Sequence, residues 1–184
     1  MSSPVPRLVA VQSLDHERAA EGLVAEYLHW VAGVASAEYG LAFDVQAMIR
    51  SDIDDKTKFY PPTGRFYLVE HAGQFVGVGG LKQLSPGVGE IQRMYVRPAV
   101  RGVGAGRLLV QRLVADARQL GYATLRLESL RALGAAHQLY RSVGFAEIEG
   151  YADNSMNAYQ APSALAAYRR SAVFMELRLP DVAS

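Results

Sequence analysis

A glycine-rich turn joins two segments of different periodicity and constrains the fold more than any other part of the chain. The turn, residues 101–106, reads Arg-Gly-Val-Gly-Ala-Gly. Residues 90–96 before it have the composition of a strand, which stops at Pro98 because proline cannot donate to a sheet ladder. Residues 104–120 after it carry leucines at helical spacing, and Gly121 is placed to end the helix. The chain therefore passes from strand to helix through a turn with an accessible backbone.

The elements on either side of this turn predict one α/β sheet. An antiparallel run of strands comes first, and helix–strand units follow. We expect a mixed, mostly antiparallel central sheet of about seven strands with helices on both faces, forming a single domain over residues 1–184. Strands are predicted at 8–11, 65–70, 75–81, 90–96, 123–128, 145–149 and 173–179, and helices after Ser13 or Asp15, after Asp44, and at 104–120 and 130–143.

Composition excludes several classes of function. Lys and Arg number 19 against 18 for Asp and Glu, so bulk charge attracts neither nucleic acid nor an acidic membrane. The chain has no cysteine, so a disulfide framework and a thiol nucleophile are excluded. No apolar run approaches the ~20 residues of a membrane helix, and the start does not resemble a signal peptide. We expect a cytoplasmic protein without a metal site, nucleic-acid partner or membrane partner.

The glycine-rich turn has the features of an anion site. A helix N-terminus leaves backbone N–H groups unpaired, and glycines let a diphosphate approach them. Arg101 adds a cationic fork. The alternative is a turn whose glycines only let the helix pack closely on the sheet. A Walker A loop is excluded because no Gly-Lys pair exists, and a dinucleotide fingerprint fails because its last glycine falls on Arg107 or Leu109.

Two motifs resemble the GNAT superfamily of N-acetyltransferases. The strand at 90–96 with Arg101-x-x-Gly104-x-Gly106 resembles the acetyl-CoA motif Arg/Gln-x-x-Gly-x-Gly/Ala of that family. Residues 136–145, Ala-His-Gln-Leu-Tyr-Arg-Ser-Val-Gly-Phe, resemble its A-x-x-L-Y-x-x-x-G-F segment. The order of elements also agrees. Two departures are Leu133, where many members have asparagine, and Glu128-Ser129, where an acidic residue is often followed by threonine.

The resemblance implies how acetyl-CoA would be bound. The strand before the turn carries a bulge in this family and parts from the next strand, which leaves a V-shaped opening. Residues 123–128 would form its other wall. The main chain of Met94, Tyr95 and Val96 would pair with the pantetheine arm. The amides that would hold the pyrophosphate are those of Arg101, Gly102, Val103, Gly104, Ala105 and Gly106.

The resemblance also implies direct transfer of the acetyl group to a primary amine in a ternary complex. Tyr140 is the candidate proton donor to the leaving sulfur; alternatively it only packs, as Leu139 does. Glu90 is the candidate base; alternatively it is an exposed carboxylate at a strand end. Glu128 is a reserve base. His137 shares a helical face with Tyr140 and could move a proton, although a satisfied or solvated histidine is the alternative.

The acceptor is expected to be a small-molecule or peptide amine, bound by the first two helices and by residues 150–172, which have no clear period. A short helix could form at 161–168. A homodimer is left open. A non-catalytic acyl-CoA-binding or sensing module is the alternative function, and a nucleotide-binding protein is disfavoured by the two failed motifs. Aromatic and polar candidates for the acceptor site are Tyr27, Trp30, Tyr39, Tyr151, Asn154, Tyr159, Tyr168 and Arg169.

Overall fold

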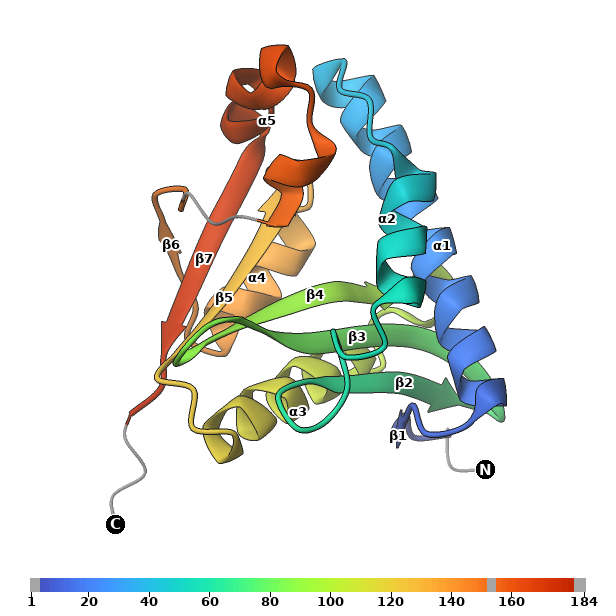
Figure 1. Cartoon of the computed structure of the whole chain (residues 1–184). Coiled ribbons are helices and arrows are strands. Elements are labelled where there is room, and N and C mark those ends of the chain that lie inside the picture. The colour runs from blue at the N-terminus through green and yellow to red at the C-terminus, as the bar shows by residue number, and fades with distance from the viewer. Residues whose placement is uncertain (1–3, 152–154, 181–184) are drawn as a thin grey trace.

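The computed structural model describes residues 4–151 and 155–180, whose strands form one seven-stranded sheet (Figure 1). The spatial order is β1-β2-β3-β4-β5-β7-β6. All neighbours are antiparallel except the pair β4 and β5, so the predicted fold class is confirmed. The strands are β1 (Arg7–Ala10), β2 (Arg65–His71), β3 (Gln74–Ser85), β4 (Val88–Val96), β5 (Thr124–Leu130), β6 (Ala146–Ile148) and β7 (Ala172–Arg178).

Helices cover both faces of this sheet, as predicted. α3 and α4 share one apolar cluster with β4 and β5, and α1 and α2 share another with β2, β3 and β4. None of the helices within the described residues is long and apolar enough to cross a membrane. The helices are α1 (Leu14–Tyr39), α2 (Val45–Asp54), α3 (Ala105–Gln119), α4 (Gly134–Ser142) and α5 (Leu165–Ser171), with 3₁₀ turns η1 (Pro98–Val100), η2 (Ser155–Tyr159) and η3 (Pro162–Ala164).

Side-chain caps fix where the first two helices begin. The Ser13 hydroxyl accepts a hydrogen bond from the His16 amide at 3.2 Å, and the Asp44 carboxylate accepts one from the Ala47 amide at 2.9 Å. Such a cap stabilises a helix by about 1 kcal/mol. The caps predicted at Ser13 and Asp44 are therefore confirmed, and they fix the first residues of α1 and α2.

The parallel pair at the centre of the sheet opens into a V. Pairing of β4 with β5 runs only from Val88↔Thr124 to Ile91↔Leu127. Beyond Ile91, β4 stays paired with β3 through a register shift, while β5 turns away (Figure 1). Arg93 lies at this bulge with φ of 57°, a left-handed conformation that costs a non-glycine residue about 1–3 kcal/mol. The implied bulge and splay are thus present, and tertiary contacts hold the backbone in them.

The predicted boundaries are wrong around β5 and α4. The helix predicted at 130–143 begins only at Gly134, because Leu130 is still paired with Ala172 of β7 and extends β5. Leucines at this spacing fit a strand end or a first helical turn equally well. α2 ends at Asp54, with Asp55 as its C-cap.

The segment at 150–172 is more ordered than its sequence indicates. In its described part the chain forms η2, η3 and α5. The short helix predicted at 161–168 is confirmed in part, because α5 begins at Leu165 and continues to Ser171. Tyr168 anchors it by packing edge-on against Phe43, with 6.0 Å between ring centroids. This contact joins α5 to the α1–α2 side of the molecule.

Candidate functional site

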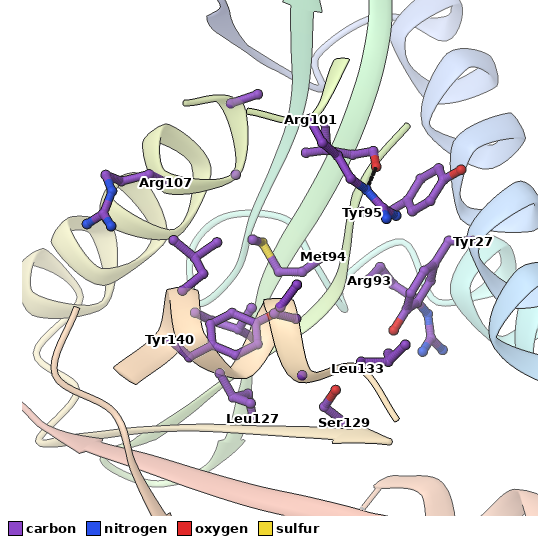
Figure 2. Close-up of a pocket in the computed structure, with 18 of the residues that line it drawn as sticks. Tyr27, Arg93, Met94, Tyr95, Arg101, Arg107, Leu127, Ser129, Leu133 and Tyr140 are labelled. Atoms are coloured by element: carbon purple, nitrogen blue, oxygen red, sulfur yellow. Dashed lines mark hydrogen bonds between the residues drawn. The ribbon is translucent and has the colours of Figure 1, made fainter. Parts of the chain in front are cut away.

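The opening between β4 and β5 contains a cavity of about 560 Å³. Its walls are the bulged half of β4, the end of β5, the start of α4, the glycine-rich turn and two aromatic residues of α1 (Figure 2). The cavity therefore extends from the glycine-rich turn, along the unpaired edge of β4, to α4. The volume lies within the range of roughly 300–1,000 Å³ that small-molecule sites occupy.

The glycine-rich turn presents unpaired backbone donors to this cavity. Gly104 is the N-cap of α3 with φ of 87°, and no side chain caps the helix. The amides of Ala105, Gly106 and Arg107 therefore have no acceptor within the helix, and they lie at its positive end. Gly102 has the same φ of 87°. Residues 101, 102 and 104–106 line the cavity, whereas Val103 does not and is 44% exposed.

The two explanations of the glycines apply to different positions. A Cβ added at Gly102 or Gly104 would meet no atom within 4 Å, so backbone conformation is what requires glycine there. A Cβ at Gly106 would lie 3.2 Å from Cδ2 of Leu139 on α4. Close helix packing therefore accounts for Gly106, and the left-handed backbone conformation of the turn accounts for Gly102 and Gly104.

Two arginines flank the turn, and only one was recognised in the sequence. The Arg101 guanidinium lies over the Trp30 ring, 5.3 Å from its centroid. Its Nε donates to the Val96 carbonyl at 3.2 Å, and Figure 2 shows Arg101 beside Tyr95. Arg107 also lines the cavity, and its Nη2 donates to Ser142 Oγ at 2.9 Å. Its signal in the sequence is its place in the first helical turn, directly after the last glycine.

The bulged half of β4 lines the cavity, and the Tyr95 side chain anchors it to α1. Met94, Tyr95 and Val96 all line the cavity, beyond the last residue that pairs with β5. The Tyr95 hydroxyl donates to Glu26 at 2.7 Å. Burial and this hydrogen bond raise the pKa of Tyr95 to about 12. Glu26 in turn accepts from Arg97 at 2.9 Å, so α1 holds the strand in its bulged path.

Tyr140 reaches the cavity from α4. Its ring lies between Met94 and Leu127 in Figure 2, and the residue is 6% exposed. Burial raises the pKa of the Tyr140 phenol well above its usual range, and neighbouring Tyr27 adds to the effect. The phenol therefore stays protonated at neutral pH and can donate. The ring also packs edge-on against Phe145, with 5.9 Å between ring centroids. Tyr140 therefore both packs against the core and lines the cavity.

A second cavity, of about 540 Å³, adjoins the first at the bulge. The two share Gln92 and Arg93. The second is lined mainly by polar side chains from the α2 region, β3, β4 and η2, including Lys58, Lys82 and Tyr159. Lys58, Lys82, Gln92 and Arg93 were not recognised as site residues in the sequence, because no local motif marks them. They come together only when distant segments fold.

The three proton-transfer candidates besides Tyr140 lie in different surroundings. Glu90 is 2% exposed, so its interpretation as an exposed carboxylate is wrong. It accepts from Gln92 Nε2 at 3.2 Å and lies 3.6 Å from Lys82 Nζ, but it lines neither cavity. Glu128 lines the first cavity. His137 is buried on α4 outside both linings, and burial lowers its pKa.

The aromatic candidates divide between the cavities and the core. Tyr27 and Trp30 line the first cavity, and Tyr159 lines the second. Asn154 lies outside the described residues. Among residues 4–151 and 155–180, no three His, Asp or Glu side chains form a group that could hold a metal ion. Of the remaining candidates for the acceptor site, Tyr168 lies in the core, Tyr39 and Tyr151 are partly buried, and Arg169 is exposed.

Comparisons with known proteins agree with this geometry. The model of the acetyltransferase (GNAT) family matches residues 24–145. The uncharacterised N-acetyltransferase YjgM of Escherichia coli is 34% identical over 119 residues, covering 62% of this chain and 71% of YjgM. An IAA acetyltransferase of Azospirillum brasilense is 28% identical over 144 residues, covering 78% and 87% of the two chains.

A solved structure shares the fold over almost the whole chain. It is the PaiA N-acetyltransferase of Thermoplasma acidophilum in complex with coenzyme A, with a TM-score of 0.65 and 17% identity. The match covers 97% of this chain and 100% of that one. The similarity therefore extends beyond the matched family segment to β1 and β7.

Proposed function

The chain belongs to the acetyltransferase (GNAT) family, and from this premise we propose that it transfers an acetyl group from acetyl-CoA to a primary amine within a ternary complex. Membership confirms the prediction of an acyltransferase. One observation carries the finer proposal: a single cavity has unpaired helix amides at one end and a protonated, buried tyrosine in its wall. The acceptor would be a small-molecule or peptide amine, and we keep the expectation of a cytoplasmic protein as part of the proposal.

The residues of the first cavity fit acetyl-CoA. The amides at the start of α3, with Arg101 and Arg107, would hold the pyrophosphate. The unpaired edge of β4 at residues 94–96 would take the pantetheine arm as an added strand. Arg101 donates to the Val96 carbonyl, which can accept a second hydrogen bond from pantetheine. When bound, acetyl-CoA supplies an activated thioester.

Tyr140 is our candidate proton donor. In the reaction a bond forms between the amine nitrogen and the acetyl carbon, and the bond from that carbon to sulfur breaks. The leaving thiolate takes a proton, and the Tyr140 phenol lies in the cavity wall that faces the bulge of β4 (Figure 2). Because burial raises the pKa of Tyr140, its proton is present throughout the physiological range. No covalent enzyme intermediate is needed, which suits a chain without cysteine.

The amine must lose a proton before it attacks, and two carboxylates are candidates for the base. Glu90 lies behind Gln92 and Lys82 of the second cavity, so we propose that it acts through a bridging water. Glu128 lines the first cavity and could act directly. Changing each to glutamine separates them. The variant that loses the acidic limb of the kcat–pH profile, while keeping its affinity for acetyl-CoA, identifies the base.

Two measurements test the proposed function. Calorimetric titration with acetyl-CoA, ATP and NAD should give binding for acetyl-CoA alone. Release of free thiol from acetyl-CoA should then depend on an added amine, drawn from a panel of amino acids, polyamines and peptides. Binding without turnover on any amine would contradict the enzymatic role and favour an acyl-CoA-sensing module. No binding of acetyl-CoA by the folded protein would overturn the proposal entirely.

A further inference from the structure

One buried carboxylate is shared by two cations in the wall of the second cavity. Asp52 of α2 accepts from Arg93, with Nε to Oδ2 at 2.5 Å and Nη2 to Oδ1 at 3.2 Å. The Lys58 ammonium also pairs with Asp52 Oδ1. The side chains of Lys58, Asp52 and Arg93 are 10%, 7% and 6% exposed. Lys58 and Arg93 line the cavity, whereas Asp52 lies behind them.

This cluster leaves one surplus positive charge in a poorly hydrated place. A buried charge without a full counter-charge is costly, because the low-dielectric surroundings replace water poorly. Burial lowers the pKa of the Lys58 ammonium; Asp52 opposes this effect, but Arg93 and Lys82 lower the pKa further. Lys82 has its own carboxylate partner, Glu90, at 3.6 Å. An anion in the cavity would neutralise the surplus positive charge of Lys58 and Arg93.

The remaining carboxylate of the cavity lining neutralises little of that charge. Asp55 accepts hydrogen bonds from the Thr57 amide at 3.0 Å and the Thr57 hydroxyl at 2.6 Å. These two bonds hold the Asp55 carboxylate within its own loop and are the main causes of its lowered pKa, and attraction to Lys58 is a smaller cause. Because Asp55 is exposed, water screens its attraction to Lys58. Most of the surplus positive charge therefore stays with Lys58 and Arg93, which line the cavity.

The position of the cluster connects it to the chemistry. Arg93 lies at the bulge where the two cavities adjoin. An acceptor in the second cavity could present its amine at the bulge and its other end to Lys58. The surplus of one positive charge matches a carboxylate, which carries one negative charge. A phosphate carries about 1.5 to 2 negative charges at neutral pH, which would exceed the surplus positive charge of the cavity.

We propose that the acceptor is an amine that carries a carboxylate, as amino acids do, and that Lys58 and Arg93 bind this carboxylate in the second cavity. This inference rests on the proposed acetyltransferase function and names its substrate class. Lys58 is the residue that tests it, because Arg93 also belongs to the bulge and its replacement would disturb the first cavity.

The first experiment compares matched acceptors. Steady-state acetyl transfer is measured with each amino acid of the panel, with its carboxamide and with the corresponding aminoalkyl phosphate, and KM is expressed as the concentration of unprotonated amine. We expect KM for the best amino acid to be about ten- to hundredfold lower than for its carboxamide, the usual effect of one hydrogen-bonded charge. Equal KM values for acid and amide, or a preference for the phosphate, would overturn the inference.

The second experiment assigns the effect to Lys58. Lys58→Met should raise KM for the amino acid to near that of the carboxamide and raise KM for the carboxamide much less; Lys58→Arg should restore part of the preference. Lys56→Met is the matched control, because Lys56 is two residues away and its side chain is 56% exposed. An unchanged Kd for acetyl-CoA, measured by calorimetry, shows that Lys58→Met is folded. If Lys58→Met keeps the carboxylate preference, the assignment is wrong.

The two proposals fail in different ways. If the folded protein binds no acetyl-CoA, or acetylates neither acids nor amides, the acetyltransferase proposal fails and takes the inference with it. If it acetylates amines without regard to the carboxylate, only the inference fails.

Discussion

The two cavities that meet at the β4 bulge are built from different materials. The first combines apolar side chains with main-chain donors, which lie at the uncapped start of α3 and along the part of β4 that does not pair with β5. The second is formed by charged and polar side chains such as Lys58 and Arg93. A site made of backbone depends on conformation, whereas a site made of side chains depends on their identity. The acceptor side can therefore change its specificity while the donor side stays the same.

The largest expected effect separates chemistry from cofactor binding. Tyr140→Phe should lower kcat by about 10²- to 10⁴-fold, because the proton donor to sulfur is lost. The Kd for acetyl-CoA should be unchanged, since the backbone donors remain. The rate of thiol release from acetyl-CoA gives kcat, and calorimetric titration gives the Kd for acetyl-CoA. Tyr168→Phe is the control, because Tyr168 is a buried core tyrosine outside both cavities. An unchanged kcat in Tyr140→Phe would mean that Tyr140 only packs.

Removing the Asp52 carboxylate, which lies behind the second cavity, should cost stability. Asp52→Asn leaves two buried cations without their counter-charge, so the free energy of unfolding should fall by about 3–5 kcal/mol. Urea denaturation followed by circular dichroism measures it. Asp55→Asn, which removes only contacts within one loop, should cost about 1 kcal/mol. Equal losses in the two variants would show that Asp52 does not act as the buried counter-charge of Lys58 and Arg93.

A change in backbone conformation should weaken the first cavity alone. Gly104→Val places a β-branched residue at φ of 87°, which costs about 1–2 kcal/mol if the turn keeps its shape. We expect the affinity for acetyl-CoA to fall by about five- to thirtyfold as the turn relaxes. Gly121→Val is the matched control, because Gly121 has φ of 76° at the other end of α3. If both variants bind acetyl-CoA equally well, the turn does not act through its backbone.

The pH dependence should be the smallest effect. Burial raises the pKa of Tyr140, so the phenol keeps its proton as the pH passes about 10, where an exposed tyrosine ionises. kcat should therefore show no alkaline decline below that pH, after subtraction of the uncatalysed reaction. A decline centred near the pKa of free tyrosine, and absent from Tyr140→Phe, would contradict the buried state of this phenol.

The donor side was largely predictable from the sequence because its signals are local. The run at 101–106 places its glycines and Arg101 next to one another, and the position of Tyr140 follows from a ten-residue motif. The bulge and the splay of β4 came from family resemblance rather than from residue periodicity. Arg107 was overlooked even though it follows the motif directly, since an arginine in a first helical turn looks like any solvated residue.

The second cavity could not be predicted in the same way. Asp52, Lys58 and Arg93 are separated by up to 41 positions and meet only through tertiary structure. In the sequence, Asp52 belongs to an acidic stretch that indicates the end of a helix, and Lys58 is one of two lysines in the segment that follows. Glu90 illustrates the same difficulty, because its burial depends on strands that cover it from both sides.

Amide hydrogen exchange with and without acetyl-CoA tests most directly the claim that main chain holds the cofactor. Acetyl-CoA should slow exchange chiefly at residues 94–96 and 102–107, the unpaired edge of β4 and the uncapped start of α3. The second cavity should respond only when an amine with a carboxylate is added. Slowing confined to other parts of the chain, with these amides unaffected at saturating acetyl-CoA, would contradict the account.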